Sequence, residues 1–71
     1  MRKIEVILNP VTEVILDGKT IGKGIGAFWD ASNYINVNFK KGETFSVSRR
    51  GKTFADRLEK EGFITKEDLN D

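Results

Sequence analysis

The chain is 71 residues long, which is the length of a single domain, and it contains neither cysteine nor histidine. These absences exclude disulfides, thiol chemistry and histidine-based acid–base catalysis, and they argue against a zinc site. The net charge of +1 hides an asymmetry, because residues 1–52 hold nine basic and five acidic side chains whereas residues 53–71 hold three basic and six acidic ones.

A β-hairpin is predicted near the N-terminus. The sequence EVIL occurs twice, in residues 5–8 and 13–16, and Asn-Pro-Val-Thr separates the two copies. Two β-branched runs around Asn-Pro are typical of a hairpin. We expect Leu8 to lie opposite Val14, because this register collects the apolar side chains on one face.

The other face of this hairpin carries Ile7 and Ile15, which need cover from elsewhere. The following Asp17-Gly18 predicts a type I′ turn, since these residues tolerate the positive φ angles that it requires. A third strand is then expected over residues 19–25. Three glycines at alternate positions share one face of this segment: Gly22, Gly24 and Gly26. They leave a bare strip against which another part of the chain can lie closely.

Residues 34–40, YINVNFK, alternate between apolar and polar side chains and predict a half-buried strand. Ile35, Val37 and Phe39 are expected to face the core. The next apolar alternation, around Phe45, predicts an antiparallel partner strand in which Phe45 lies opposite Phe39. The first of these two strands would display a polar face on its other side.

The aromatic residues Phe28 and Trp29 precede that strand. We expect them to belong to the core, because a chain of this size needs its largest rings there. The sequence alone leaves open whether Trp29 is a core or a surface residue.

A helix of about nine residues is predicted to begin at Thr53, which would form a capping box with Asp56. Phe54 and Leu58 would form its apolar stripe. Gly62 is placed to end the helix in the left-handed conformation.

A short second helix is predicted from Thr65 onward. The pattern over residues 57–71 resembles the short C-terminal helical modules called SHOCT domains. Six residues carry this resemblance: Leu58, Glu61, Gly62, Ile64, Thr65 and Leu69. The resemblance implies a pair of helices, and no function is carried over from it.

The predicted fold is α+β. It consists of a small antiparallel five-stranded meander sheet or open barrel, of about the size of an SH3 domain, with a C-terminal helix and a short terminal helical turn. Residues 1–50 would form the sheet and residues 53–71 the helical part of a single domain, 1–71. Glu5 and Pro10 interrupt the N-terminal apolar run, so we expect no signal peptide, no membrane segment and a cytoplasmic protein.

Gly51-Lys52-Thr53 matches the last three residues of the phosphate-binding loop motif. Ser46 stands where that loop requires its first glycine, which argues against nucleotide hydrolysis. A helix start next to basic side chains can still hold an anion. Alternatively Thr53 caps the helix and the basic side chains are solvated. The sequence pattern of a dinucleotide-binding fingerprint also occurs around Gly24, but it does not lie in a predicted βαβ unit, which the fingerprint requires.

We therefore expect a small non-enzymatic binding module without metal or cofactor, and an accessory regulator that binds nucleic acid through a basic strand face. The residues expected to bind nucleic acid are Lys23, Tyr34, Asn36, Asn38, Lys40, Lys41, Arg49, Arg50 and Lys52. The alternative is a protein-interaction module, which would be an adaptor, an inhibitor or a homodimer, and which would use an exposed strand edge or the Ile7/Ile15 face.

Overall fold

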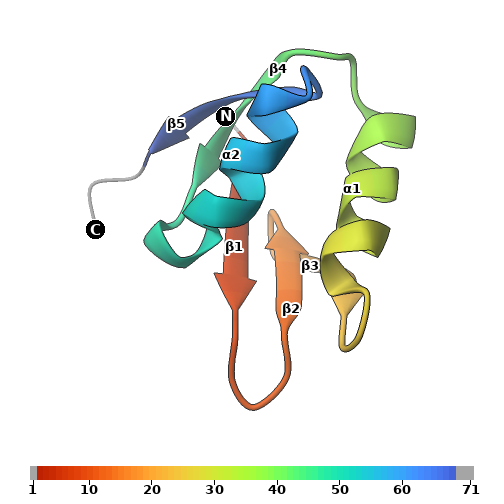
Figure 1. The fold of residues 1–71 in the computed structure, drawn as a ribbon, viewed down its shortest axis with the longest axis vertical. Helices are drawn as coiled ribbons and strands as arrows, with labels where there is room; N and C mark the ends of the chain where they lie inside the picture. The colour runs from red at the N-terminus through yellow and green to blue at the C-terminus, as the bar shows by residue number, and fades with distance from the viewer. Residues whose placement is uncertain (1, 69–71) are drawn as a thin grey trace.

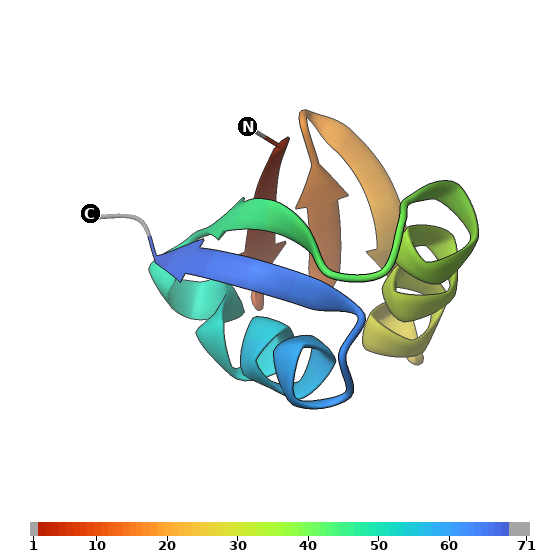
Figure 2. The same ribbon diagram turned by 90° about the horizontal axis from the view of Figure 1, so that it is seen from above.

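A computed structural model describes residues 2–68 of the chain and shows an α+β protein with one five-stranded sheet. In chain order its elements are β1 (Arg2–Ile7), β2 (Glu13–Leu16), β3 (Lys19–Lys23), α1 (Ala27–Asn38), β4 (Glu43–Val47), the 3-10 turn η1 (Arg49–Gly51), α2 (Lys52–Lys60) and β5 (Ile64–Asp68). Both helices lie on the same face of the sheet, as Figure 1 and Figure 2 show from two directions.

The sheet is mixed and open, with the strand order β3-β2-β1-β4-β5. The β1–β2 and β2–β3 pairs are antiparallel, whereas β1–β4 and β4–β5 are parallel. The predicted wholly antiparallel meander is therefore wrong, and the sheet does not close into a barrel. Parallel neighbours need crossover connections, which α1 and α2 supply. Both crossovers run in the same direction across the sheet. Because crossover connections share the same handedness, both helices lie on the same face of the sheet.

The predicted hairpin is present as β1 and β2, but its register differs by two residues. Val6 lies opposite Val14, and Ile4 lies opposite Leu16. A shift of two keeps every side chain on its predicted face, so the apolar face is buried as expected and Leu8 falls beyond the end of β1. Asp17 and Gly18 have φ angles of 49° and 83°, which confirms the predicted turn.

Residues 27–38 form helix α1, so the predicted strand over residues 34–40 is wrong. Ile35 is buried, but Val37 is 80% exposed and Phe39 is only partly buried. The alternation of the apolar residues was misleading because a second spacing competes with it. Ala27, Ala31 and Ile35 recur every four residues, and all three face the core.

Strand β4 consequently has different partners from the predicted one, and it lies between β1 and β5. Phe45 and Val47 still point inward and are fully buried. The expected proximity of Phe39 and Phe45 also survives, because their rings meet edge to face with centroids 5.3 Å apart. Side-chain alternation thus predicted the inward face of β4 correctly, but not its neighbours.

The predicted C-terminal helix is present as α2, in which Phe54 and Leu58 are buried. Gly62 has a φ of 83° and ends the helix as expected. Its N–H donates to the carbonyl of Glu59 at 3.0 Å, and the N–H of Phe63 donates to the carbonyl of Leu58 at 2.9 Å. This pair of bonds is a Schellman motif.

The predicted capping box is absent, because Gly51 occupies the N-cap position and no side chain caps the helix. The predicted second helix is also wrong, since Ile64–Asp68 form strand β5 in parallel with β4. Ile64 enters the core, and this burial favours the extended conformation over a short polar helix. Leu69, the expected anchor of that helix, lies outside the described residues.

The close approach predicted for the glycine strip occurs at Gly22 in β3. A Cβ atom there would lie 2.1 Å from the carbonyl oxygen of Ala27, at the start of α1. Gly24 and Gly26 instead adopt positive φ angles in the turn between β3 and α1. Gly22 therefore sets how closely the helix can lie against the sheet.

Replacing Gly22 by alanine should lower the free energy of unfolding by about 1–3 kcal/mol, because the new methyl group must displace the backbone of α1. Chemical denaturation followed by circular dichroism measures this change. The matched control is Lys23→Ala, at an exposed neighbouring position, which should change stability by less than about 0.5 kcal/mol. Equal effects of the two substitutions would contradict this account of the helix position.

Candidate functional site

The residues expected to bind nucleic acid do not form one surface. Tyr34, Asn36 and Asn38 lie on helix α1 instead of on a strand face. Lys40 and Lys41 precede β4, and Lys23 is the last residue of β3. The remaining three, Arg49, Arg50 and Lys52, follow β4 in η1 and at the start of α2. Strand β4 therefore separates the two lysines at its amino end from the two arginines at its carboxyl end.

Tyr34 takes part in packing at the end of the sheet where β1 and β4 begin. Its ring lies 6.4 Å from that of Phe39, and the ammonium group of Lys19 lies 5.1 Å from its centroid. The guanidinium of Arg2 covers Phe39 at 4.6 Å and is ion-paired with Glu43 at 2.6 Å. These contacts fix the end of α1 on the sheet, which is a structural role for an aromatic side chain that was expected to bind nucleic acid.

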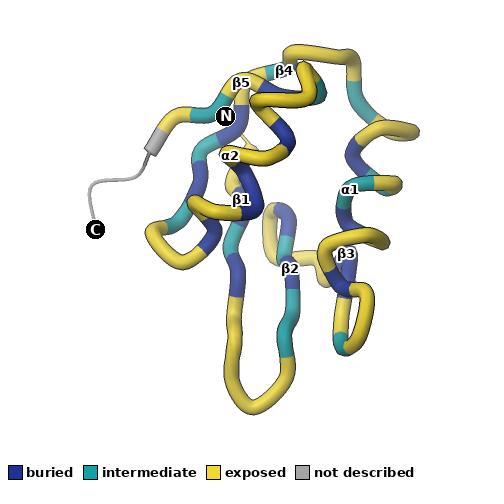
Figure 3. The backbone as a smooth tube through the Cα atoms, viewed as in Figure 1, coloured by how far each residue is buried: buried dark blue, intermediate teal, exposed yellow. Residues whose placement is uncertain are grey.

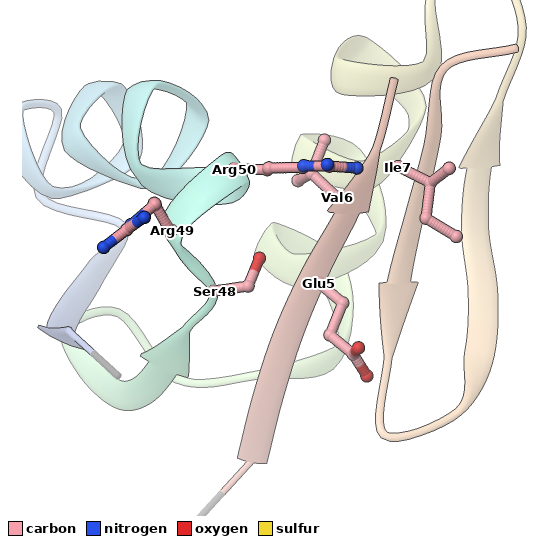
Figure 4. Close-up of a pocket in the computed structure, with 6 residues that line it drawn as sticks. All are labelled: Glu5, Val6, Ile7, Ser48, Arg49 and Arg50. Atoms are coloured by element: carbon pink, nitrogen blue, oxygen red, sulfur yellow. The ribbon is translucent and has the colours of Figure 1, made fainter. Parts of the chain in front are cut away.

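A crevice of about 330 Å³ lies at the opposite, carboxyl end of the sheet. The residues that line it are Glu5, Val6, Ile7, Ser48, Arg49 and Arg50, as shown in Figure 4. It opens where the parallel strands β1 and β4 end side by side. The chain leaves β1 toward β2 and leaves β4 toward β5, in opposite directions along the sheet.

Backbone groups of β1 contribute to this crevice. The N–H of Ser48 donates to the carbonyl of Ile4 at 3.0 Å, and the register between the two strands ends at the pair Ile4–Val47. Alternate residues of a strand direct their peptide groups to the same side. The N–H and C=O of Val6 therefore point to the same side of β1 as those of Ile4, beyond the end of the ladder with β4.

The side chains of the crevice add a hydroxyl and two positive charges. The Oγ atom of Ser48 is buried and has no hydrogen-bond partner among the described residues. In Figure 4 the guanidinium of Arg50 extends from η1 toward β1, while that of Arg49 points away from β1. The carboxylate of Glu5 points away from Arg50 in the same view. The crevice thus combines an unpaired polar atom with the positive charge of Arg50.

A second concave surface separates the two helices. This groove has a volume of about 480 Å³ and is lined by Phe28, Trp29, Ser32, Asn33, Thr53, Phe54, Arg57, Leu58, Glu61 and Phe63. The rings of Phe28 and Phe54 stack across it with centroids 5.1 Å apart. Trp29 is 75% exposed, so the expectation that it belongs to the core is wrong. Phe28 is 41% exposed, so the expectation that it belongs to the core is wrong as well.

The sheet face opposite the helices carries Ile7 and Ile15, as the hairpin predicted. Ile7 is 38% exposed and Ile15 is half-buried. Polar neighbours accompany them, including Glu13, which accepts a hydrogen bond from the hydroxyl of Thr20. Two isoleucines among charged and hydroxyl side chains make a smaller apolar surface than the one on the helices.

Within residues 2–68, no group of three or more acidic side chains is arranged to hold a metal ion. No helix in the same range is long and apolar enough to cross a membrane. The fold and these surfaces define a small α+β domain in which two helices cover one face of a mixed sheet and a crevice opens between two parallel strand ends. Comparisons with protein-family models, curated proteins and solved structures find no match, so the SHOCT resemblance has no support from a family model.

Replacing Ser48 by alanine should leave the free energy of unfolding unchanged or raise it by up to about 1 kcal/mol, because its hydroxyl is buried without a partner. A serine that capped the helix through its side chain would instead cost about 1 kcal/mol on this substitution. Urea denaturation of both proteins at the same pH distinguishes the two results. A clear loss of stability would show that the hydroxyl has a partner in solution.

Proposed function

We propose that this chain is a small non-enzymatic binding module that holds the phosphate backbone of a nucleic acid at the carboxyl end of its sheet. The observation that supports this function is the crevice between β1 and η1, which Arg49 and Arg50 line and across which Arg50 extends toward β1. The proposal keeps the nucleic-acid function expected from the sequence and moves its centre from α1 to the end of β4.

A phosphate group suits this crevice for two reasons. Arginine presents several N–H donors in a fixed fork that matches phosphate oxygens. A ligand oxygen that reached the hydroxyl of Ser48 would offset the free-energy cost of its burial without a partner.

The composition of the crevice favours the backbone of a nucleic acid over its bases. None of the six lining residues is aromatic, so the crevice offers no ring on which a base can stack. Contacts to phosphates position a nucleic acid without reading its sequence. The protein should therefore bind with little sequence preference and with an affinity that depends strongly on salt.

A fluorescence-anisotropy titration with short single-stranded and double-stranded DNA at two salt concentrations tests this function. The wild-type protein should bind more weakly at the higher salt, and Arg49→Ala/Arg50→Ala should weaken binding and reduce the salt slope by about one to two phosphate contacts. Glu5→Gln should strengthen binding, because it removes the acidic group that lines the crevice.

Lys40→Ala/Lys41→Ala provides the matched control, because it removes the same charge at the other end of β4. This double variant should retain most of the affinity and the wild-type salt slope. If the lysine pair mattered as much as the arginine pair, binding would depend on net charge alone and the crevice would not be the site. Absence of binding by the wild-type protein at the lower salt would remove the proposed function.

A further inference from the structure

Both helices begin at the end of the sheet where the crevice opens. Strand β2 is antiparallel to β1 and β3 is antiparallel to β2, so β3 runs in the same direction as β1. Strand β4 is parallel to β1. Because α1 follows β3 and α2 follows β4, both helices start where β1 and β4 end, and Figure 1 shows them running upward from there. The crevice and the first turns of both helices therefore lie at the same end of the molecule.

The groove between α1 and α2 brings aromatic side chains to that end. Four of the ten residues that line it are aromatic: Phe28, Trp29, Phe54 and Phe63. The rings of Phe28 and Phe54 stack with centroids 5.1 Å apart, which joins the first turns of the two helices. Trp29 follows Phe28 and is 75% exposed, and Figure 3 shows this part of α1 as exposed. The groove therefore presents an indole ring to solvent beside a stacked pair of rings.

The groove lies close to an arginine of the crevice. Arg50 lines the crevice and Thr53 lines the groove, three residues farther along the chain. Because residues 49–60 form successive helical turns, the Cβ atoms of these two residues are about 5–6 Å apart. A nucleic-acid strand with a phosphate at Arg50 therefore has its neighbouring nucleotides within reach of the groove.

The charge at the start of α2 favours a nucleotide over an apolar peptide as the occupant of the groove. Residues 49–57 hold four basic side chains and one acidic one, Asp56, which is ion-paired with Lys66 at 2.5 Å. Of the four, Arg57 lines the groove itself, and its side chain is 83% exposed. The guanidinium of Arg57 lies 4.0 Å from the carboxylate of Glu61, which is the acidic residue in the groove lining. A polyanion therefore meets an excess of positive charge along this surface.

The α1 side of the groove suits the uncharged edge of a base. Its polar lining residues are Ser32 and Asn33, whereas the exposed Asp30 of the same helix is not among the residues that line the groove. Hydroxyl and amide groups pair with the donors and acceptors on a base edge. The groove volume of about 480 Å³ also lies in the range of small-ligand sites.

We propose that the groove holds a base of the same nucleic acid whose phosphates bind in the crevice, and that this base stacks on the indole ring of Trp29. The inference rests on the proposed phosphate site and adds a second contact to it. Stacking on an aromatic ring tolerates any base, because every base has a π-face. It requires an unpaired base, since the bases of a duplex are already paired and stacked on each other. The protein should therefore bind a single strand more tightly than a duplex.

Titration with three DNA oligonucleotides of equal length tests this inference: a single strand, the corresponding duplex, and an abasic single strand that keeps the phosphates but lacks the bases. Anisotropy of a label on the DNA measures binding, and the fluorescence of Trp29, which is the only tryptophan, reports on the groove. The ordinary single strand should quench this fluorescence, whereas the abasic strand and the duplex should bind without quenching it. Binding of the ordinary single strand without quenching would overturn the inference.

Substitutions in α1 locate the contact. Trp29→Ala should weaken binding of the ordinary single strand about tenfold, as expected for the loss of one stacked base, and should leave the affinity for the abasic strand unchanged. Trp29→Phe keeps an aromatic ring and should retain most of the affinity. Val37→Ala is the matched control, because Val37 is 80% exposed on the same helix and does not line the groove. Circular dichroism verifies that each variant is folded, and wild-type affinity of Trp29→Ala for the single strand would contradict the stacking contact.

These measurements separate the base contact from the phosphate site on which it rests. Equal affinity of the wild-type protein for the ordinary and the abasic single strand would overturn the base contact and leave the phosphate site in place. Absence of binding to all three oligonucleotides would remove both. A shift of Trp29 emission to shorter wavelength when the free protein is concentrated would show that a second copy occupies the groove, and this result would also overturn the inference.

Discussion

The close contact between β3 and the start of α1 is the constraint on which the other features of this structure depend. A single added carbon at Gly22 would lie 2.1 Å from the carbonyl oxygen of Ala27, so the helix lies as near to the sheet as the backbone permits. So short a separation leaves room only for a small side chain at the start of the helix, where Ala27 lies. Farther along α1, Ile35 is buried against the sheet, whereas Trp29 and Val37 are exposed.

The same helix determines the topology of the sheet. By crossing from β3 to the far side of β1, α1 places β4 parallel to β1 and not beside β3. The ends of two parallel strands then lie next to each other, and the chain leaves them in opposite directions. A crevice lies at these strand ends, and it is lined by Ser48, Arg49 and Arg50 beyond β4 and by Glu5, Val6 and Ile7 of β1.

Local sequence signals were reliable wherever a short segment determines its own conformation. The turn at Asp17-Gly18 and the helix end at Gly62 depend on positive φ angles, which few residues tolerate. The apolar stripe of α2 and the inward face of β4 follow from side-chain periodicity. The failures occurred where two periodicities coexist or where a segment is short. In residues 34–40 the strand alternation was more regular than the spacing of four that the helix uses, and residues 64–68 form a strand only because β4 offers a free edge and Ile64 a place in the core.

The sequence by itself determined that the chain builds a hairpin, turns at a fixed dipeptide and forms the amphipathic helix α2, because these features arise from interactions among near neighbours. It also determined that basic side chains surround the end of β4. Only the tertiary structure decided that residues 27–38 are helical, that β4 lies between two parallel strands, and which side of α1 faces water. These outcomes depend on contacts between residues far apart in the chain, such as Gly22 with Ala27 or Ile4 with Val47. Side-chain periodicity within one segment carries no information about which distant segment will pack against it.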